Sequence, residues 1–298
     1  MSAALPGWRP LVVALLLAAA AAWLGAGHGW RHGALWLLGA ALGLVLFHAT
    51  FSFAGAFRRL LAEARGAGLR AQLAMLGLAL CLFLPALDAG QILGQPVRGF
   101  VFPIGTALLL GAFLFGIGMQ LGGGCGSGTL FSAGGGLGLR MWITLAAFIA
   151  GATLAAQDAE RWMDWPALPP VSLPGLLGTW PALALSLLVL ALVWRFAVVL
   201  ERRRHGVAEP LPWRAREGAA ALLAGPWPLL WGAVGLALLN FATLWLAGRP
   251  WAITAAFPLW GSRLVEATGW DDPAFWAYWE DPTRTEALLR PLLADRTT

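Results

Sequence analysis

The sequence is poor in charged residues, and lysine is absent from it. Asp, Glu, Lys and Arg make up 12% of the 298 residues, whereas hydrophobic residues make up 59%. Soluble domains carry about 25% charged residues, so this composition excludes an ordinary soluble domain. All twenty basic residues are arginine, and the abundance of Ala, Gly, Leu and Arg is typical of a GC-rich genome. The net charge of +5 therefore gives no reason to expect a nucleic-acid partner.

Cysteine is also scarce, because Cys81 and Cys125 are the only two. Two cysteines exclude a disulfide-rich scaffold, and their separation does not supply the paired ligands of a metal site. The chain contains no Walker loop, HExxH or GxSxG motif, and no carboxylates in its central apolar segments. We therefore expect no enzyme activity, no cofactor, no metal, no ATP-driven transport by this chain alone, and no proton relay through carboxylates. Cys81 lies in a plain apolar stretch and is interpreted as an inert core residue.

Long apolar runs take the place of charge. Several of them approach the roughly 20 residues that a membrane-spanning helix needs. They predict an all-α, polytopic membrane protein with roughly 7–9 transmembrane or broken, re-entrant helices. The first run could also be a secretory signal peptide, but the many later runs favour an uncleaved helix. The expected helices cover about residues 11–24, 34–57, 69–87, 100–120, 127–133, 141–157, 181–200, 228–247 and 252–265.

The arginine distribution predicts the orientation of these helices. Loops 58–70 and 201–216 are basic and are expected on the cytoplasmic side. Loop 158–178 is acidic and rich in Trp and Pro, so it is expected outside, against the membrane surface. With alternating helices, the N-terminus is then cytoplasmic. Many of the 18 tryptophans lie near helix ends, where an interfacial belt is the ordinary interpretation; among them are Trp8, Trp30, Trp142, Trp162, Trp165, Trp180, Trp213 and Trp227.

The most informative stretch is residues 115–140, FGIGMQLGGGCGSGTLFSAGGGLGLR. It contains eleven glycines, one cysteine and no charge before Arg140. Glycine runs form poor helix and expose backbone N–H and C=O groups. Non-helical chain at membrane depth is tolerated only where protein buries it or where it lines a cavity. This pattern predicts a helix broken within the membrane around the thiol of Cys125.

The residues around Cys125 could bind an anion. Successive N–H groups in a glycine-rich turn form an anion-binding nest, and the following short helix would point its positive N-terminus at the same place. Transporters commonly bind substrate at such broken helices. The alternative is helix packing through Gly118-x-x-x-Gly122, with the cysteine as a small filler. The candidate residues are Gln120, which ends the preceding helix, Gly124, Cys125, Gly126, Ser127, Gly128 and Thr129.

Other intramembrane polar residues are further candidates. His48 and Ser52 are four residues apart in the expected helix 34–57 and would share one face. They could face a pathway, or the histidine could bond a neighbouring carbonyl. Asn240, the only asparagine, could line the pathway or pin two helices together. Arg249 and Thr254 lie in a second expected break, residues 248–254, where the arginine could attract anions or anchor the interface.

The sequence resembles the YeeE/YedE sulfur-transport family, whose members include bacterial inner-membrane thiosulfate transporters. The resemblance rests on GIGMQLGGGCGSGTLFSAGGG, on FSFAGAFRR in the second helix and on GRPWAITAAFPLWG near the C-terminus. It implies a membrane-embedded helical fold with pseudo-repeated halves, in which cysteine S–H groups hydrogen-bond to the passing anion. Cys125 corresponds to the family cysteine in the glycine-rich segment. Ser52 stands where such proteins often carry another cysteine, between two phenylalanines.

These patterns lead to one expectation and two rivals. We expect residues 1–267 to form a transport domain in the bacterial inner membrane, and residues 268–298 to form a polar tail or a truncated C-terminal part of that domain. The domain would import a small sulfur-containing anion, thiosulfate first, past the neutral thiol of Cys125. The first rival is a component that delivers sulfur or selenium to a cytoplasmic carrier protein through a Cys125 persulfide. The second is a non-transporting, structural or truncated family member.

Overall fold

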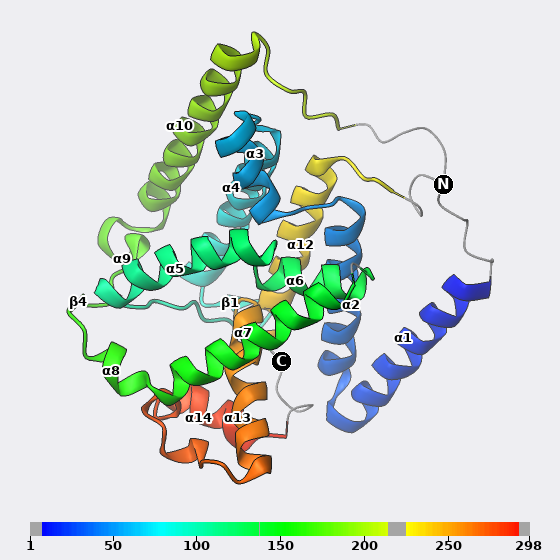
Figure 1. Ribbon diagram of the computed structural model, residues 1–298, viewed down its shortest axis with the longest axis vertical. Coiled ribbons are helices and arrows are strands. Elements are labelled where there is room, and N and C mark those ends of the chain that lie inside the picture. Colours follow the sequence, from blue (N-terminus) through cyan, green and yellow to red (C-terminus); the bar gives the residue numbers. More distant parts are fainter. Residues whose placement is uncertain (1–7, 137, 214–224, 292–298) are drawn as a thin grey trace.

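The computed structural model describes residues 8–136, 138–213 and 225–291, and most of them are helical (Figure 1). The long helices are α1 (Trp8–His28), α2 (Trp30–His48), α4 (Ala67–Asp88), α5 (Thr106–Gly122), α7 (Leu139–Gln157), α10 (Thr179–His205), α12 (Leu229–Ala247) and α13 (Ala256–Thr268). The short helices are α3 (Phe53–Glu63), α6 (Gly126–Gly134), α8 (Ala159–Met163), α9 (Leu173–Leu177), α14 (Pro282–Leu289), η1 (Ile253–Ala255), η2 (Pro273–Phe275) and η3 (Ala277–Trp279). Two-residue strands form two small antiparallel pairs, β1 (Gln91–Ile92) with β2 (Gln95–Pro96) and β3 (Ile104–Gly105) with β4 (Ala167–Leu168).

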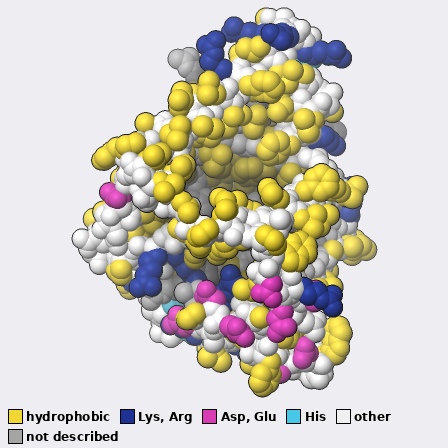
Figure 2. Space-filling view, turned by 90° about the vertical axis from the view of Figure 1, so that its left-hand side faces the viewer, with side chains coloured by type: hydrophobic (Ala, Val, Ile, Leu, Met, Phe, Trp, Pro, Cys, Tyr) yellow, Lys and Arg dark blue, Asp and Glu magenta, His cyan; other side chains and the backbone are white. Residues whose placement is uncertain are grey.

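Within the described residues, seven helical segments are long and apolar enough to cross a membrane. In two of them a long helix is followed by a break and a short helix, α2 with α3 and α5 with α6. Large apolar side chains cover much of one face of the molecule, with a group of arginines at one end and acidic residues, among further arginines, gathered towards the other (Figure 2). This arrangement confirms the expected all-α, multi-pass membrane protein.

The second expected helix, residues 34–57, is wrong as a continuous element. Helix α2 ends at His48, and α3 begins at Phe53 after a four-residue break. Thr50 adopts a positive φ of 46°, and the Ser52 hydroxyl caps α3 by accepting a hydrogen bond from the Gly55 N–H at 3.0 Å. Phe51, within the break, is 2% exposed and belongs to the core. His48 and Ser52 therefore do not share one helical face.

Two successive parts of the chain repeat one order of elements. Helices α2, α3 and α4 have 19, 11 and 22 residues, and helices α5, α6 and α7 have 17, 9 and 19. In each part a long helix breaks, a short helix follows, and the short helix packs against the next long one. The N-cap residues of the two short helices are Ser52 and Cys125. This repetition agrees with the expectation of pseudo-repeated halves.

Helix α12 packs against both α2 and α4 and forms the main core with them. Leu42, Ala71 and Leu236 are buried there, one from each of the three helices. Phe131 of α6 and Trp251 of the second break pack against the same cluster. The short helix α6 and the second break of the chain therefore both pack against the core formed by α2, α4 and α12.

Helix α13 packs closely against α7. A Cβ atom at Gly261 would overlap the Thr153 hydroxyl at 1.6 Å, so only glycine permits this approach. The described part of the expected tail folds back onto this pair of helices, because Trp276 and Trp279 are 5% and 4% exposed in a cluster with Leu259. Residues 292–298 of that expected tail lie outside the described residues.

Two expected loops contain more structure than the sequence indicates. The acidic segment 158–178 holds α8, β4 and α9, and β4 pairs with β3 at the start of α5. Helix α10 extends to His205, which places the first residues of the basic segment 201–216 in helix. Residues 214–216 of that segment lie outside the described residues. The opposite charge of these two segments is what the expected orientation requires, and the orientation itself stays a prediction.

The tail is attached to the end of α7 through Asp271. Its carboxylate accepts hydrogen bonds from Trp276 Nε1 at 3.0 Å, from the Asp272 N–H at 2.9 Å and from Gln157 Nε2 at 2.8 Å. These donors, the Trp276 indole foremost, lower the pKa of Asp271 below its ordinary value of 3.8. Because this pKa is lower in the folded state, the ionised carboxylate stabilises the fold at pH values above the ordinary pKa. This contribution is lost as the pH falls through the folded-state pKa.

We expect Asp271→Asn to loosen the tail at neutral pH and to remove this acid dependence. Hydrogen exchange of residues 270–280 in detergent, followed between about pH 6 and pH 3, measures both effects. Wild-type protection should fall at the acid end of this range, whereas the variant should start lower and stay level. Equal pH profiles for the two proteins would contradict the role given to Asp271. Asp272→Asn serves as the neighbouring control. In the wild type, the Asp272 carboxylate caps η2 by accepting a hydrogen bond from the Ala274 N–H.

Candidate functional site

Cys125 stands at the turn between α5 and α6. Helix α5 ends at Gly122 and is capped by Gly123, whose φ of 80° is the left-handed conformation that glycine adopts without strain. Cys125 is then the N-cap residue of α6, in an extended conformation and half-buried. The expected short helix 127–133 is confirmed as Gly126–Gly134, and the predicted interruption around the thiol is confirmed with it.

The Cys125 thiol has a hydroxyl beside it. Its Sγ lies 3.3 Å from Ser127 Oγ, and either atom could be the donor. Because Ser127 is at the second position of α6, both groups lie at the helix N-terminus, where the first N–H groups have no partner within the helix. The N-terminus also carries a partial positive charge. Together these groups form a compact set of hydrogen-bond donors with a sulfur atom at its centre.

Thr129 adds a buried hydroxyl that has no partner. Its side chain is fully buried, and Oγ1 makes no hydrogen bond within the described residues. A Cβ atom at Gly124 would lie 3.2 Å from this oxygen and 3.1 Å from the Thr129 backbone nitrogen. A buried hydroxyl without a partner is costly and needs an explanation. Here it lies directly beside the turn that carries Cys125.

The glycines on either side of the thiol are positions of close approach. A Cβ at Gly126 would lie 3.3 Å from Thr254 Cγ2 and 3.4 Å from the Phe257 ring. One at Gly128 would lie 3.5 Å from the sulfur of Cys125. The second break of the chain, residues 248–254, thus reaches the glycine–cysteine turn through Thr254.

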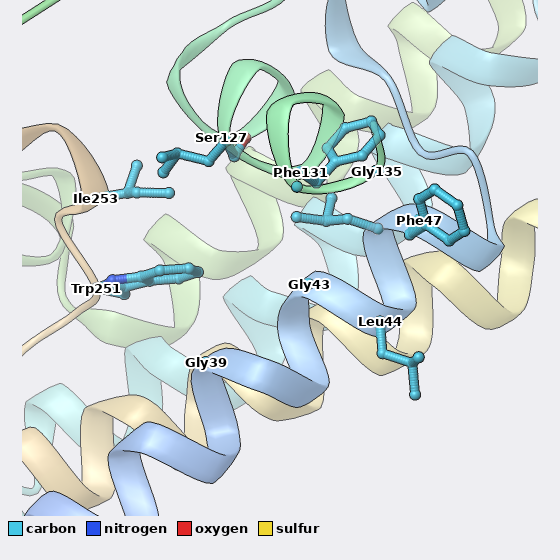
Figure 3. Close-up of a pocket in the computed structure, with 12 residues that line it drawn as sticks. Gly39, Gly43, Leu44, Phe47, Ser127, Phe131, Gly135, Trp251 and Ile253 are labelled. Atoms are coloured by element: carbon cyan, nitrogen blue, oxygen red, sulfur yellow. The ribbon is translucent and has the colours of Figure 1, made fainter. Parts of the chain in front are cut away.

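A cavity of about 490 Å³ opens beside Ser127. Its walls are α2, α6 and the segment that follows Arg249 (Figure 3). The Trp251 side chain extends from that segment towards the space between α2 and α6, and Phe47 and Phe131 line the cavity from the two helices. Ser127 therefore lies between the thiol and the cavity. The sequence interpretation did not find the cavity, because it forms from three segments that are far apart in the chain.

The other candidate residues occupy different places. The Ser52 hydroxyl caps α3, and its carbonyl accepts a hydrogen bond from Gln72 Nε2 at 3.3 Å. Gln120 is exposed, and its amide donates to the Ala54 carbonyl at 3.3 Å, which ties the end of α5 to the start of α3. Asn240 donates to the Leu236 carbonyl of its own helix at 2.8 Å. These contacts give all three residues structural partners.

His48 and Arg249 lie at two breaks. His48 ends α2, its carbonyl accepts a hydrogen bond from the Trp227 N–H at 2.7 Å, and its ring meets the Trp227 ring edge-on. Arg249 follows Gly248, the residue that caps the C-terminus of α12, and is half-buried. Of the residues predicted from sequence, the structure brings together Gly124, Cys125, Gly126, Ser127, Gly128, Thr129 and Thr254.

One positive charge beside the turn was not identified as part of the site from sequence. Arg140, at the start of α7, places Nη2 2.9 Å from the position that a Cβ on Gly123 would occupy. In the sequence this arginine stands out only as the first charged residue after the glycine-rich stretch. Its contact with the turn depends on how α6 reverses the chain between α5 and α7, which no local pattern indicates.

The fold and this site define a class of protein. The described residues contain seven apolar helical segments long enough to cross a membrane, and the segment that breaks between α5 and α6 carries a thiol at the N-terminus of its short helix, as broken helices do in multi-pass membrane transporters. The comparison with protein families then gives a match to the sulphur-transport family over residues 48–285, more than half of the chain. The chain therefore belongs to the sulphur-transport (YeeE/YedE) family and is a sulfur-related membrane transporter. The search of curated proteins returns no match.

Proposed function

We propose that the protein imports a small sulfur-containing anion, thiosulfate first, past Cys125. The observation that carries this proposal is the contact between the Cys125 thiol and the Ser127 hydroxyl at the edge of the cavity. The thiol lies at the N-terminus of α6, and Ser127 lines the cavity. An anion in the cavity would therefore lie beside Ser127, whose hydroxyl contacts the thiol.

The chemistry of the donors suits such an anion. The N–H groups at the start of α6 and the hydroxyl of Ser127 can hydrogen-bond to oxyanion oxygens. The unpartnered Thr129 hydroxyl, behind Gly124, would gain a partner when an anion occupies the turn. The soft, polarisable sulfur of Cys125 then faces the terminal sulfur that distinguishes thiosulfate from sulfate.

The thiol acts as a neutral donor in this proposal. A thiolate would repel a dianion, whereas an S–H group can donate a weak hydrogen bond to it. Weak donors hold the anion briefly, and conduction requires binding that is weak enough for the ion to leave. No covalent adduct is needed. The protein would lie in the bacterial inner membrane with its N-terminus and the arginine-rich end of α10 in the cytoplasm.

Growth on thiosulfate tests the proposal. A bacterium that lacks its own sulfate and thiosulfate uptake is supplied with thiosulfate as the only sulfur source. The strain that expresses this chain should grow, whereas the strain with an empty vector should not. Absence of growth despite verified insertion in the membrane would overturn thiosulfate import.

The same cells distinguish the rival in which the protein delivers sulfur to a carrier. Cys125 isolated from cells fed with thiosulfate should have the mass of an unmodified thiol. A stable gain of one sulfur atom on Cys125 would favour delivery through a persulfide. Cys81, which is exposed on α4, gives the background level of modification in the same sample.

A further inference from the structure

The part of the cavity wall that α2 forms has glycine, and therefore no side chain, at two positions. Gly39 and Gly43 both line the cavity, and a Cβ atom added to either would meet no atom within 4 Å. Glycines four residues apart in a membrane helix ordinarily allow a second helix to approach closely. Here nothing in residues 8–136, 138–213 and 225–291 lies within 4 Å of either Cβ position, so the two glycines leave space open.

Other glycines on the same helix and across the cavity show the contrast. A Cβ at Gly33 would lie 2.4 Å from the Ala21 carbonyl oxygen, which is the close approach of α1 to α2. One at Gly135 would lie 2.7 Å from the Phe47 ring. Close packing therefore accounts for Gly33 and Gly135 but does not account for Gly39 and Gly43.

The composition of the wall limits what can occupy the cavity. Among the lining residues that the structure describes, Ser127 has the only hydroxyl, and no lining side chain is charged. A volume of about 490 Å³ corresponds to roughly 16 water molecules at about 30 Å³ each. A compact anion fits with part of its water shell. The wall offers no charge to replace lost hydration, so the anion must keep water on its charged oxygens, and a weakly hydrated terminal sulfur suits this wall better than a further oxyanion oxygen.

We propose that this cavity is the waiting site of the transported anion, from which the anion passes over Ser127 to Cys125, and that Gly39 and Gly43 hold it open. The inference rests on the proposed function for the identity of the anion. The family match begins at residue 48, so these two glycines lie outside the matched region. The ligand class is a small anion that carries a terminal sulfur.

Filling the cavity from α2 tests the role of the two glycines. Gly43→Leu places a branched side chain where the cavity is now open. We expect it to lower the initial rate of thiosulfate uptake by at least tenfold, and Gly39→Leu to do the same. Gly111→Leu is the matched control, because Gly111 also has no atom within 4 Å of its Cβ position but lies on α5, away from the cavity. It should transport at the wild-type rate.

A second measurement follows access to Cys125 directly, in a Cys81→Ala background. A small methanethiosulfonate reagent should modify Cys125, and thiosulfate should slow this modification. Gly43→Leu should slow it at least fivefold without thiosulfate, whereas Gly111→Leu should leave the rate unchanged. Equal amounts of protein in the membrane and equal melting temperatures in detergent show that each variant is folded.

The outcomes separate the two proposals. If Gly43→Leu takes up thiosulfate and is labelled at the same rates as the wild type, the proposed waiting site is wrong. That result would favour a lipid chain as the occupant of the cavity. If the wild-type chain takes up no thiosulfate, the proposed function fails. The labelling rates then still decide whether the cavity leads to Cys125, because they depend on the reagent alone.

Discussion

Replacing Cys125 with alanine is expected to abolish growth on thiosulfate while leaving the protein folded in the membrane. Alanine removes the thiol but leaves the backbone of the turn unchanged. A hydrogen bond to a charged group contributes about 1.5–3 kcal/mol, and the weak S–H donor belongs at the lower end, which corresponds to roughly a 10-fold loss in affinity for the passing anion. Uptake of labelled thiosulfate into cells measures the effect directly.

Cys125→Ser separates the hydrogen bond from the sulfur atom. Serine keeps a donor and is a strongly preferred N-cap residue, so α6 should be at least as stable as in the wild type. We expect partial uptake, between those of the alanine variant and the wild type. The sequence predicts Cys81 in the core, but the residue is exposed on α4, so Cys81→Ala should have no effect. Wild-type growth of the alanine variant would remove the thiol from the mechanism.

The sequence predicts the helix that follows Cys125 well, because the pattern around it is local. Three glycines end α5, and the next run of residues forms helix until three further glycines end it. The break between α2 and α3 was not predicted. The run HATFSFAGAF contains no proline and a single glycine, so its apolar character indicates continuous helix. Ser52 was an available N-cap signal, but without a Glu or Gln three residues later it is a weak one.

The candidate site was predictable only in part, for the same reason. Cys125, Ser127 and Thr129 are close in sequence, and helical geometry alone places them together. The contact of Thr254 with Gly126 depends on the path of the chain after Gly248. The sequence predicts a second break there, at residues 248–254, but not this contact. The role of Gly39 as an open position could not be predicted, because a glycine pattern in a membrane helix ordinarily indicates packing.

Glu201 shows how tertiary packing can override local sequence. It precedes three arginines and was predicted to lie in the basic loop 201–216, on the cytoplasmic side. In the structure it is 0% exposed, within α10 where this helix crosses α4. Arg70 Nη2 donates to Glu201 Oε2 at 3.0 Å and also to the Glu209 carbonyl at 2.6 Å. The partner is 131 residues away in sequence, so no local pattern could indicate the pair.

Replacing Glu201 with alanine is expected to destabilise the protein strongly. The Arg70 side chain is 8% exposed, and without Glu201 its charge remains buried, with the Glu209 carbonyl as its one hydrogen-bond acceptor among the described residues. Arg65, 3.9 Å from the same carboxylate, loses its counter-charge too. Removal of one partner of a buried ion pair costs about 3–5 kcal/mol. The melting temperature in detergent, followed by the fluorescence of the many tryptophans, should fall markedly.

A double variant distinguishes loss of the ion pair from loss of side-chain volume. Arg70→Met with Glu201→Leu removes both charges and keeps apolar contacts with Trp194, over whose ring the guanidinium now lies. Since an apolar pair of similar volume can equal a buried ion pair, this variant should regain most of the lost stability. Glu286→Ala, which breaks an exposed pair with Arg290, should change stability by less than about 1 kcal/mol. A double variant less stable than Glu201→Ala would mean that the charges themselves hold α10 against α4.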